Sequence, residues 1–146
     1  MNSLPRTMGR AQRIALNVLV VLLSVHANVA SSQEVRVALS GDQEIPPVAT
    51  LASGAGTITV NADRSLIGSV TITGMSVTVA HLHDAAAGTN GPIAIPLVRT
   101  ADNVWSVPQG AKFTDAQYES FKAGNLYFNI HSEAHRSGEI RGQIRP

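Results

Sequence analysis

The chain has 146 residues and a formal net charge of +1, from 11 Lys and Arg against 10 Asp and Glu, which fits one ordinary domain. It contains no cysteine, so disulfides, zinc fingers, iron–sulfur clusters and cysteine-ligated copper sites are excluded. Any bound metal must therefore be held by histidine, carboxylate, tyrosine or backbone atoms.

The first thirty residues have the order of a secretory signal peptide. Residues 1–13 are basic without an acidic residue, residues 14–25 are almost entirely apolar, and mainly small residues follow. We therefore predict a signal peptide over residues 1–30, with cleavage after Ala27, Ala30 or Ser32. A membrane anchor is the alternative, but about twelve apolar residues are too short to cross a hydrocarbon core of about 30 Å as a helix. We expect a secreted or periplasmic protein with no membrane span after cleavage.

Removal of the leader changes the charge balance. Cleavage after Ala30 would leave 116 residues (146 − 30) and would remove three arginines and no acidic residue. Eight Lys and Arg (11 − 3) would then stand against ten Asp and Glu, so the formal net charge would fall from +1 to −2. The remaining chain has no basic run of the kind that binds nucleic acid, and we expect no nucleic-acid partner.

Residues 34–146 are expected to form one β-domain. Alternating apolar and polar residues between turn signals predict strands at residues 34–40, 54–61, 66–74, 76–83, 93–100, 103–108, 126–132 and 139–145. Pro96 indicates an edge strand or a bulge. Thr114 and Gln117 fit a capping box, and Gly124 fits a helix end, which predicts one helix between them. The prediction is an all-β fold, an antiparallel Greek-key-like β-sandwich of seven to eight strands with one short helix.

Four of the five histidines lie in two short segments near strand ends. His26 belongs to the predicted leader, and the others form the pairs His81/His83 and His131/His135. Side chains two apart in a strand share one face, with Cα atoms about 6.6 Å apart, so two imidazoles can converge on one ion. The alternative is two unrelated pairs of solvated or backbone-bonded histidines. The clustering favours one site of four imidazoles.

A site of four histidines without a carboxylate favours Cu(II) by the affinity order of divalent ions, with zinc as the second choice. Histidine must be neutral to bind metal, so affinity should fall below about pH 6. Other polar side chains near the two segments could support the ligands or line the same pocket. These candidates are Asp84, Tyr127, Asn129, Glu133 and Glu139. The carboxylates could equally be ordinary solvated groups, and Tyr127 could be a packed ring.

Several segments together resemble the CHRD domain, a module named after chordin and also found in exported bacterial proteins. They are EIPP from Glu44, AHLHDAAAGTNGP from Ala80, LYFNIHSEAH from Leu126 and GEIRGQI from Gly138. The resemblance extends over about residues 35–144. It implies an all-β sandwich whose biochemical role is poorly defined.

The histidine pattern is also similar, more loosely, to that of copper-zinc superoxide dismutase. In this likeness, His81 and His83 match the H-x-H copper ligands, and His131 matches a ligand on a late strand. Arg141 matches an arginine that guides anions, although strand alternation would also place it simply facing away from the core. The chain departs from that pattern, because it lacks a bridging histidine, a zinc subsite and a disulfide, and His135 has no counterpart.

Two functions remain open from the sequence. The first is an exported metal-binding domain that carries copper or uses it for redox chemistry, including superoxide-dismutase-like activity. The second is a non-catalytic extracellular module that binds a protein partner and whose histidines are structural. A hydrolase is disfavoured, because G-x-S-x-G, paired catalytic carboxylates and a cysteine nucleophile are all missing. The catalytic residues are unknown, and Arg141 is the single candidate.

Overall fold

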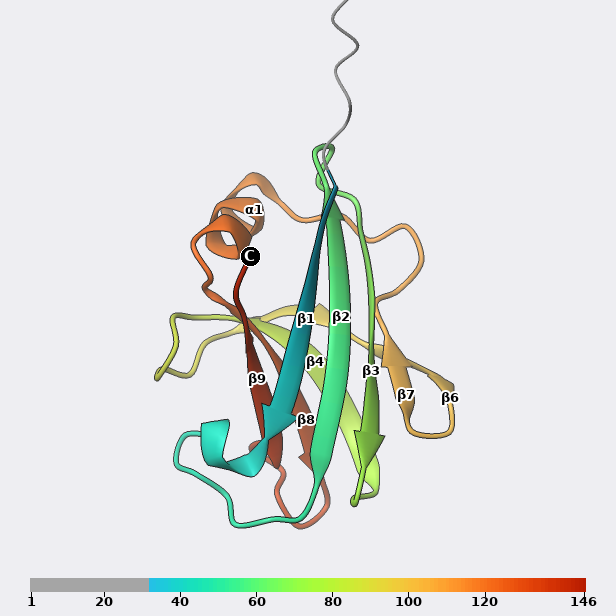
Figure 1. Cartoon of the computed structure of the whole chain (residues 1–146), viewed down its shortest axis with the longest axis vertical. Coiled ribbons are helices and arrows are strands. Elements are labelled where there is room, and N and C mark those ends of the chain that lie inside the picture. The colour runs from blue at the N-terminus through green and yellow to red at the C-terminus, as the bar shows by residue number, and fades with distance from the viewer. Residues whose placement is uncertain (1–31) are drawn as a thin grey trace, which may run out of the picture.

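The structure, a computed structural model, describes residues 32–146 (Figure 1). The predicted signal peptide, residues 1–30, lies outside the described residues. Between residues 32 and 146, no helix is long and apolar enough to span a membrane.

Strands make up most of the regular structure, as the alternating pattern predicts. They are β1 (Ser32–Ser40), β2 (Ser53–Asn61), β3 (Leu66–Thr73), β4 (Val77–Asp84), β5 (Ile93–Pro96), β6 (Val98–Ala101), β7 (Val104–Ser106), β8 (Leu126–Ser132) and β9 (Ile140–Ile144). A 3-10 turn, η1 (Gly41–Gln43), follows β1, and the helix α1 (Asp115–Lys122) lies between β7 and β8. The predicted capping box of Thr114 and Gln117 opens the helix, and Gly124, with a φ of 73°, follows its end.

The strands form one antiparallel sheet in the order β5-β4-β8-β9-β1-β2-β3-β7-β6. Figure 1 shows β1, β2 and β3 in front of β9, β8 and β4, so the sheet folds over into a front layer and a rear layer. At the fold, the pairing of β1 with β9 is limited to Ser40 and Arg141. On the opposite side, the chain runs from β5, which pairs with β4, into β6, which pairs with β7.

The expected all-β sandwich is confirmed, with nine strands in the described chain rather than seven or eight. The segment 93–100, predicted as one strand, is split at Leu97. Leu97 is buried and donates its N–H to the carbonyl of Ala80 (2.9 Å), so the chain bends inward where it crosses between the layers. Pro96 ends β5, which is an edge strand, as expected.

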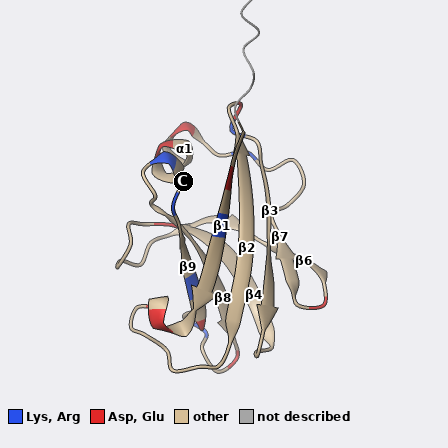
Figure 2. Ribbon diagram, in the orientation of Figure 1, with Lys and Arg blue, Asp and Glu red and all other residues tan. Residues whose placement is uncertain are grey.

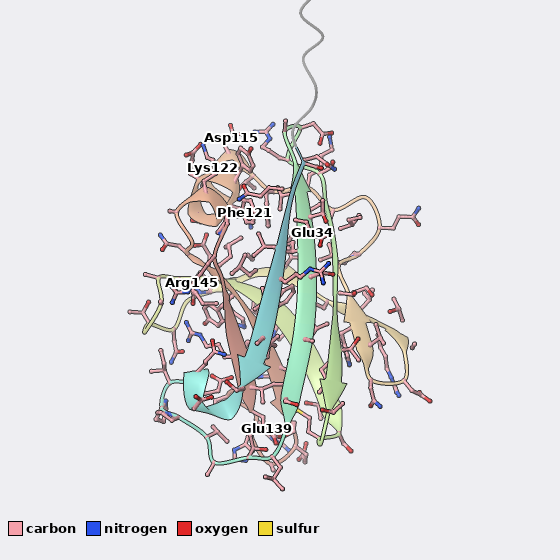
Figure 3. The ribbon with its side chains drawn as sticks, in the orientation of Figure 1. Glu34, Asp115, Phe121, Lys122, Glu139 and Arg145 are labelled. Atoms are coloured by element: carbon pink, nitrogen blue, oxygen red, sulfur yellow. The ribbon has the colours of Figure 1, made fainter. Side chains whose placement is uncertain are left out.

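The core lies between the two layers and is built by the inward face of each strand. Its fully buried large side chains include Leu39, Ile58, Val70, Ile72, Leu82, Phe128, Ile130 and Ile140. Burying one such side chain contributes about 1.5–3 kcal/mol. Phe121 belongs to α1 and is 1% exposed. Its side chain lies between the helix and the sheet and fills one end of the sandwich (Figure 3).

The outward faces of the two layers differ. In the front layer the outward residues, such as Arg36, Thr57 and Thr71, are exposed. In the rear layer all seven residues of β8 are buried, so both faces of this strand are covered. Three loop segments, residues 44–50, 85–92 and 133–138, contribute partners to its outward side chains. The strands of both layers carry few charged residues and are mostly tan in Figure 2.

Candidate metal centre

Two neighbouring strands of the rear layer position three of the histidines. β4 and β8 pair antiparallel, and the register sets His131 opposite Val79, two residues from His81. His81 and His83 share the face of β4 that carries Val79, so their rings lie beside that of His131. The H-x-H pair and the strand histidine meet on one patch, as the clustering of the histidines suggested.

The rings of His81, His83 and His131 form one compact group. The ring centroids of His81 and His131 lie 5.0 Å apart, those of His81 and His83 5.4 Å, and those of His83 and His131 6.2 Å. One ligand nitrogen from each ring lies within 4.8 Å of the other two. Two metal–nitrogen bonds of about 2.0–2.1 Å each span about 4 Å, so only small side-chain movements separate this arrangement from three-point coordination.

Backbone carbonyls fix the protonation of two rings. The Nδ1 of His83 lies 2.8 Å from the carbonyl of Gly91, and the Nδ1 of His131 lies 2.9 Å from the carbonyl of Arg136. A carbonyl only accepts, so each Nδ1 carries the proton and each Nε2 keeps a free lone pair. The Nε2 of His131 lies 3.2 Å from the Nδ1 of His81. The buried Nε2 of His83 has no hydrogen-bond partner in residues 32–146.

Burial keeps all three imidazoles neutral. It lowers the pKa of His81 to about 4, and the nearby rings of His131 and His83 lower it further. Burial also lowers the pKa of His83 and of His131, although the bond that each ring makes to a backbone carbonyl opposes the shift. Neutral imidazoles anchored through one nitrogen, as those of His83 and His131 are, are the usual form of histidine metal ligands.

His135, the expected fourth ligand, is not part of this group. It is half-buried in the loop after β8 and lines a cavity of about 440 Å³ with residues 44–49. The loop reverses here, because the His135 carbonyl accepts from the N–H groups of Ser132 (3.4 Å) and Gly138 (3.1 Å). The structure thus brings together three of the four predicted ligands.

Two of the predicted supporting residues lie beside the group. The ring of Tyr127 stacks on that of His83, with centroids 5.0 Å apart and planes at 11°. Its hydroxyl accepts from the Gly91 N–H (3.2 Å), so Tyr127 touches both the ligand and the loop that anchors it. Asn129 is buried in the same row and donates to the Glu44 carboxylate and to the Ile140 carbonyl (3.3 Å), not to a histidine.

None of the three predicted supporting carboxylates bonds to a histidine ring within the described residues. Glu133 is exposed and pairs with Arg136. Glu139 is buried and accepts from the Thr50 hydroxyl (2.7 Å). Although burial alone would raise the pKa of Glu139, hydrogen bonds hold it below its usual range. No side-chain bond from Asp84 to a histidine occurs within the described residues, and the ring acceptors are backbone carbonyls instead.

Arg141 is placed differently from the expected anion guide. Its side chain faces away from the core, as alternation predicts, yet the residue is only 2% exposed. Its guanidinium lies 3.4 Å from the ring centroid of Tyr127 and donates to the Asn90 side chain (3.0 Å) and the Thr89 carbonyl (2.6 Å). A buried, fully engaged cation does not meet incoming solutes, so a direct catalytic role does not fit this position.

The groups that anchor the histidine rings could not be predicted from the sequence. The carbonyls of Gly91 and Arg136 carry no sequence signal, because every residue has a carbonyl. Gly91 does have a steric reason to be glycine, since a Cβ there would lie 2.0 Å from the Asp84 carbonyl oxygen. Glu44 is also buried in this region, and burial raises the pKa of its carboxyl, which accepts from Asn129.

Comparison with known proteins agrees with the resemblance seen in the sequence. No curated protein and no solved structure matches the chain, so the likeness to copper-zinc superoxide dismutase rests on the histidine pattern alone. The family model of the CHRD domain matches residues 35–144, which is most of the chain. The chain therefore belongs to the CHRD domain family.

Proposed function

We propose that this domain binds one transition-metal ion through His81, His83 and His131. The observation that carries the proposal is the free, buried Nε2 of His83, because a buried polar atom without a partner costs about 1–3 kcal/mol. Its lone pair lies in a group with two further neutral imidazoles. A metal ion would satisfy all three at once, with the anchoring bonds to Gly91 and Arg136 already made.

Copper is the first choice for this ion and zinc the second. Imidazole nitrogens suit both, and Cu(II) leads the affinity order for divalent first-row metals. The group contains three histidines and no carboxylate, so it lacks the ligand type that hard cations such as Mg²⁺ and Ca²⁺ prefer. CHRD domains are generally extracellular, which agrees with a secreted or periplasmic location for this chain.

The proposal extends to redox chemistry of the superoxide-dismutase type. Three protein ligands leave at least one coordination position for a small external ligand, and a bound copper ion would supply one-electron chemistry there. The chain's own part is to hold the ligands. Gly91 and Arg136 fix the orientation of two rings, and His81 is half-buried.

Metal analysis and titration of the protein, purified without a histidine tag, test the proposal. We expect one Cu(II) per chain, a d–d absorption band and a rise in melting temperature on metal addition. His81→Ala and His131→Ala should each weaken binding by at least about a hundredfold, because each removes one of three ligands. His135→Ala is the matched control and should retain the parent affinity, because His135 lies outside the group.

Two results would contradict the proposal. If the parent binds neither copper nor zinc, the histidines are structural, and the alternative of a protein-interaction module becomes the better account. If His81→Ala and His131→Ala bind copper as tightly as the parent, the ion is held elsewhere. A loss of affinity in His135→Ala equal to that in His81→Ala would restore the four-histidine site expected from the sequence.

A further inference from the structure

Three side chains from three adjacent strands form a stack beside the histidine group. The guanidinium of Arg141 (β9) covers one face of the Tyr127 ring (β8) at 3.4 Å, and the imidazole of His83 (β4) covers the ring at a centroid distance of 5.0 Å. The planes of His83 and Tyr127 are nearly parallel, at 11°. Tyr127 is itself only 2% exposed, so its ring is held in place by the packing around it. The stack therefore limits rotation of the His83 ring about its side-chain bonds.

The same arginine holds the loop that anchors His83. Its two terminal nitrogens donate to the Asn90 side chain (3.0 Å) and to the Thr89 carbonyl (2.6 Å). These residues directly precede Gly91, whose carbonyl accepts from the His83 Nδ1 and whose N–H donates to the Tyr127 hydroxyl. Arg141 thus acts on His83 by two routes, through the Tyr127 ring and through the loop 85–92.

Stability alone does not explain why a buried cation, the guanidinium of Arg141, occupies this position. A buried charge is expensive to desolvate, and well-packed apolar residues often replace buried ion pairs without loss. The positive charge of Arg141 favours the charged form of Glu44, but that carboxylate is bonded to Asn129, and no salt bridge to Arg141 occurs within residues 32–146. What the guanidinium supplies, and an apolar side chain could not, is a flat face for Tyr127 together with donors for the loop.

We infer that Arg141 is a positioning residue that fixes the His83 ring, through Tyr127 and the loop 85–92, in the orientation required of a metal ligand. The inference rests on the proposed metal site and adds to it the residue that sets the site's geometry. Arg141 itself touches no metal ligand in this arrangement. Its role differs from that of an anion guide, because it acts on the ligand and not on a solute.

Arg141→Lys tests the inference, because lysine keeps the charge and loses the planar fork. We expect Cu(II) affinity to fall about 10- to 100-fold, the usual effect of removing a group that orients a ligand. We also expect the electron paramagnetic resonance spectrum of the copper-loaded protein to change. Arg36→Lys is the matched control, since Arg36 is an exposed strand arginine, and it should leave both measurements at their parent values.

A purely structural role would give a different outcome. Arg141→Lys would then lower the melting temperature of the metal-free protein while the copper affinity and the spectrum of the folded fraction stayed at parent values. That outcome would overturn the inference. Tyr127→Leu, which removes the ring between Arg141 and His83, should reproduce the affinity loss, and parent affinity in this variant would equally contradict the role assigned to the stack.

Nitrogen-15 NMR of the histidine side chains separates this inference from the proposed function. In the metal-free parent, His83 should show a single tautomer protonated at Nδ1, and Arg141→Lys should mix its tautomers or broaden its signals. If the parent binds no metal but this NMR change occurs, the proposed function fails while the positioning role of Arg141 stands. If the parent already shows mixed tautomers at His83, the positioning role fails, whatever metal the protein binds.

Discussion

The two layers of the sandwich follow the same alternation and end with different outward faces. On β2, in the front layer, the outward Thr57 is exposed and Thr59 is half-exposed. On β8, in the rear layer, the outward Tyr127, Asn129 and His131 are all buried. Water covers the first face, and loops cover the second. A polar residue at an outward position therefore indicates which face of the strand points away from the apolar core. Whether that face is solvated depends on the loop segments that cross it.

The buried outward face of the rear layer acts as a second, polar interior. Most of its groups have partners, as in the bond of Asn129 to Glu44, and loops contribute backbone partners to the histidines. The Nε2 of His83 is an exception. The apolar interior lies on the opposite side of the same strand, where Phe128 alternates with these residues. Substitutions at adjacent positions of β8 can therefore compare the two interiors directly.

The largest effect is expected at the apolar interior. Phe128 is 0% exposed, and Phe128→Ala should lower the free energy of unfolding by about 3–5 kcal/mol, from lost burial and the cavity that remains. Urea unfolding followed by the fluorescence of the single tryptophan, Trp105, measures it. A loss below about 1 kcal/mol would show that the two layers do not pack as described.

A smaller loss is expected at the polar interior. Asn129→Leu should lower the free energy of unfolding by about 1–3 kcal/mol, because the buried Glu44 carboxyl and the Ile140 carbonyl each lose the hydrogen bond that Asn129 donates. In the double variant Asn129→Leu with Glu44→Met, both side chains of the pair are apolar. Its loss should be smaller than the sum of the single losses. Additive losses would mean that the two side chains do not interact.

The sequence predicted the fold well where each face has one environment. In β1, β2 and β3, inward residues meet the core and outward residues meet water, so alternation alone identifies the strands. It failed at Leu97, because the mainly apolar run 93–98 reads as one strand while the chain crosses between layers there, and Pro96 indicated only an edge or a bulge. A crossover between layers depends on the tertiary structure, and an apolar residue within a strand-like segment does not reveal it.

The candidate site, like the fold, was predictable only where its residues lie in regular strands. Alternation placed His81 and His83 on one face, and the clustering of the histidines grouped His131 with them, which agrees with the arrangement on β4 and β8. His135 lies in a loop, where no periodicity relates position to direction. The environment of Arg141 was not predictable either, since alternation correctly gave its direction but could not show that the loop 85–92 covers it.

A modest effect of pH is expected from the buried histidines. In the unfolded chain they titrate near a pKa of about 6.5, whereas burial lowers the pKa of His81 to about 4 in the folded state. Between pH 6.5 and 4 the unfolded chain binds more protons, so the free energy of unfolding of the metal-free protein should fall as the pH falls. His83 and His131 act in the same direction.

Glu44 opposes this trend, because burial raises its pKa, so its contribution is present at low pH and is lost as the pH rises. Comparison with His81→Gln therefore isolates the histidine effect. The free energy of unfolding, measured by urea titration at several pH values, should fall less steeply in this variant than in the parent. Equal slopes in the two proteins would show that His81 does not contribute to the pH dependence.

The smallest effect is expected on the outward face of the front layer. Thr57→Val should change the free energy of unfolding by less than about 0.5 kcal/mol, because the side chain is exposed and valine is an equally good strand former. The substitution is the counterpart of Asn129→Leu, polar to apolar on an outward face, so the contrast between the two measures the effect of the covering loops. A loss above about 1 kcal/mol in Thr57→Val, especially one that depends on protein concentration, would mean that another surface covers the front face in solution. Loops would then cover the rear layer, and a partner would cover the front layer. That result would support the alternative function of the domain, a protein-interaction module.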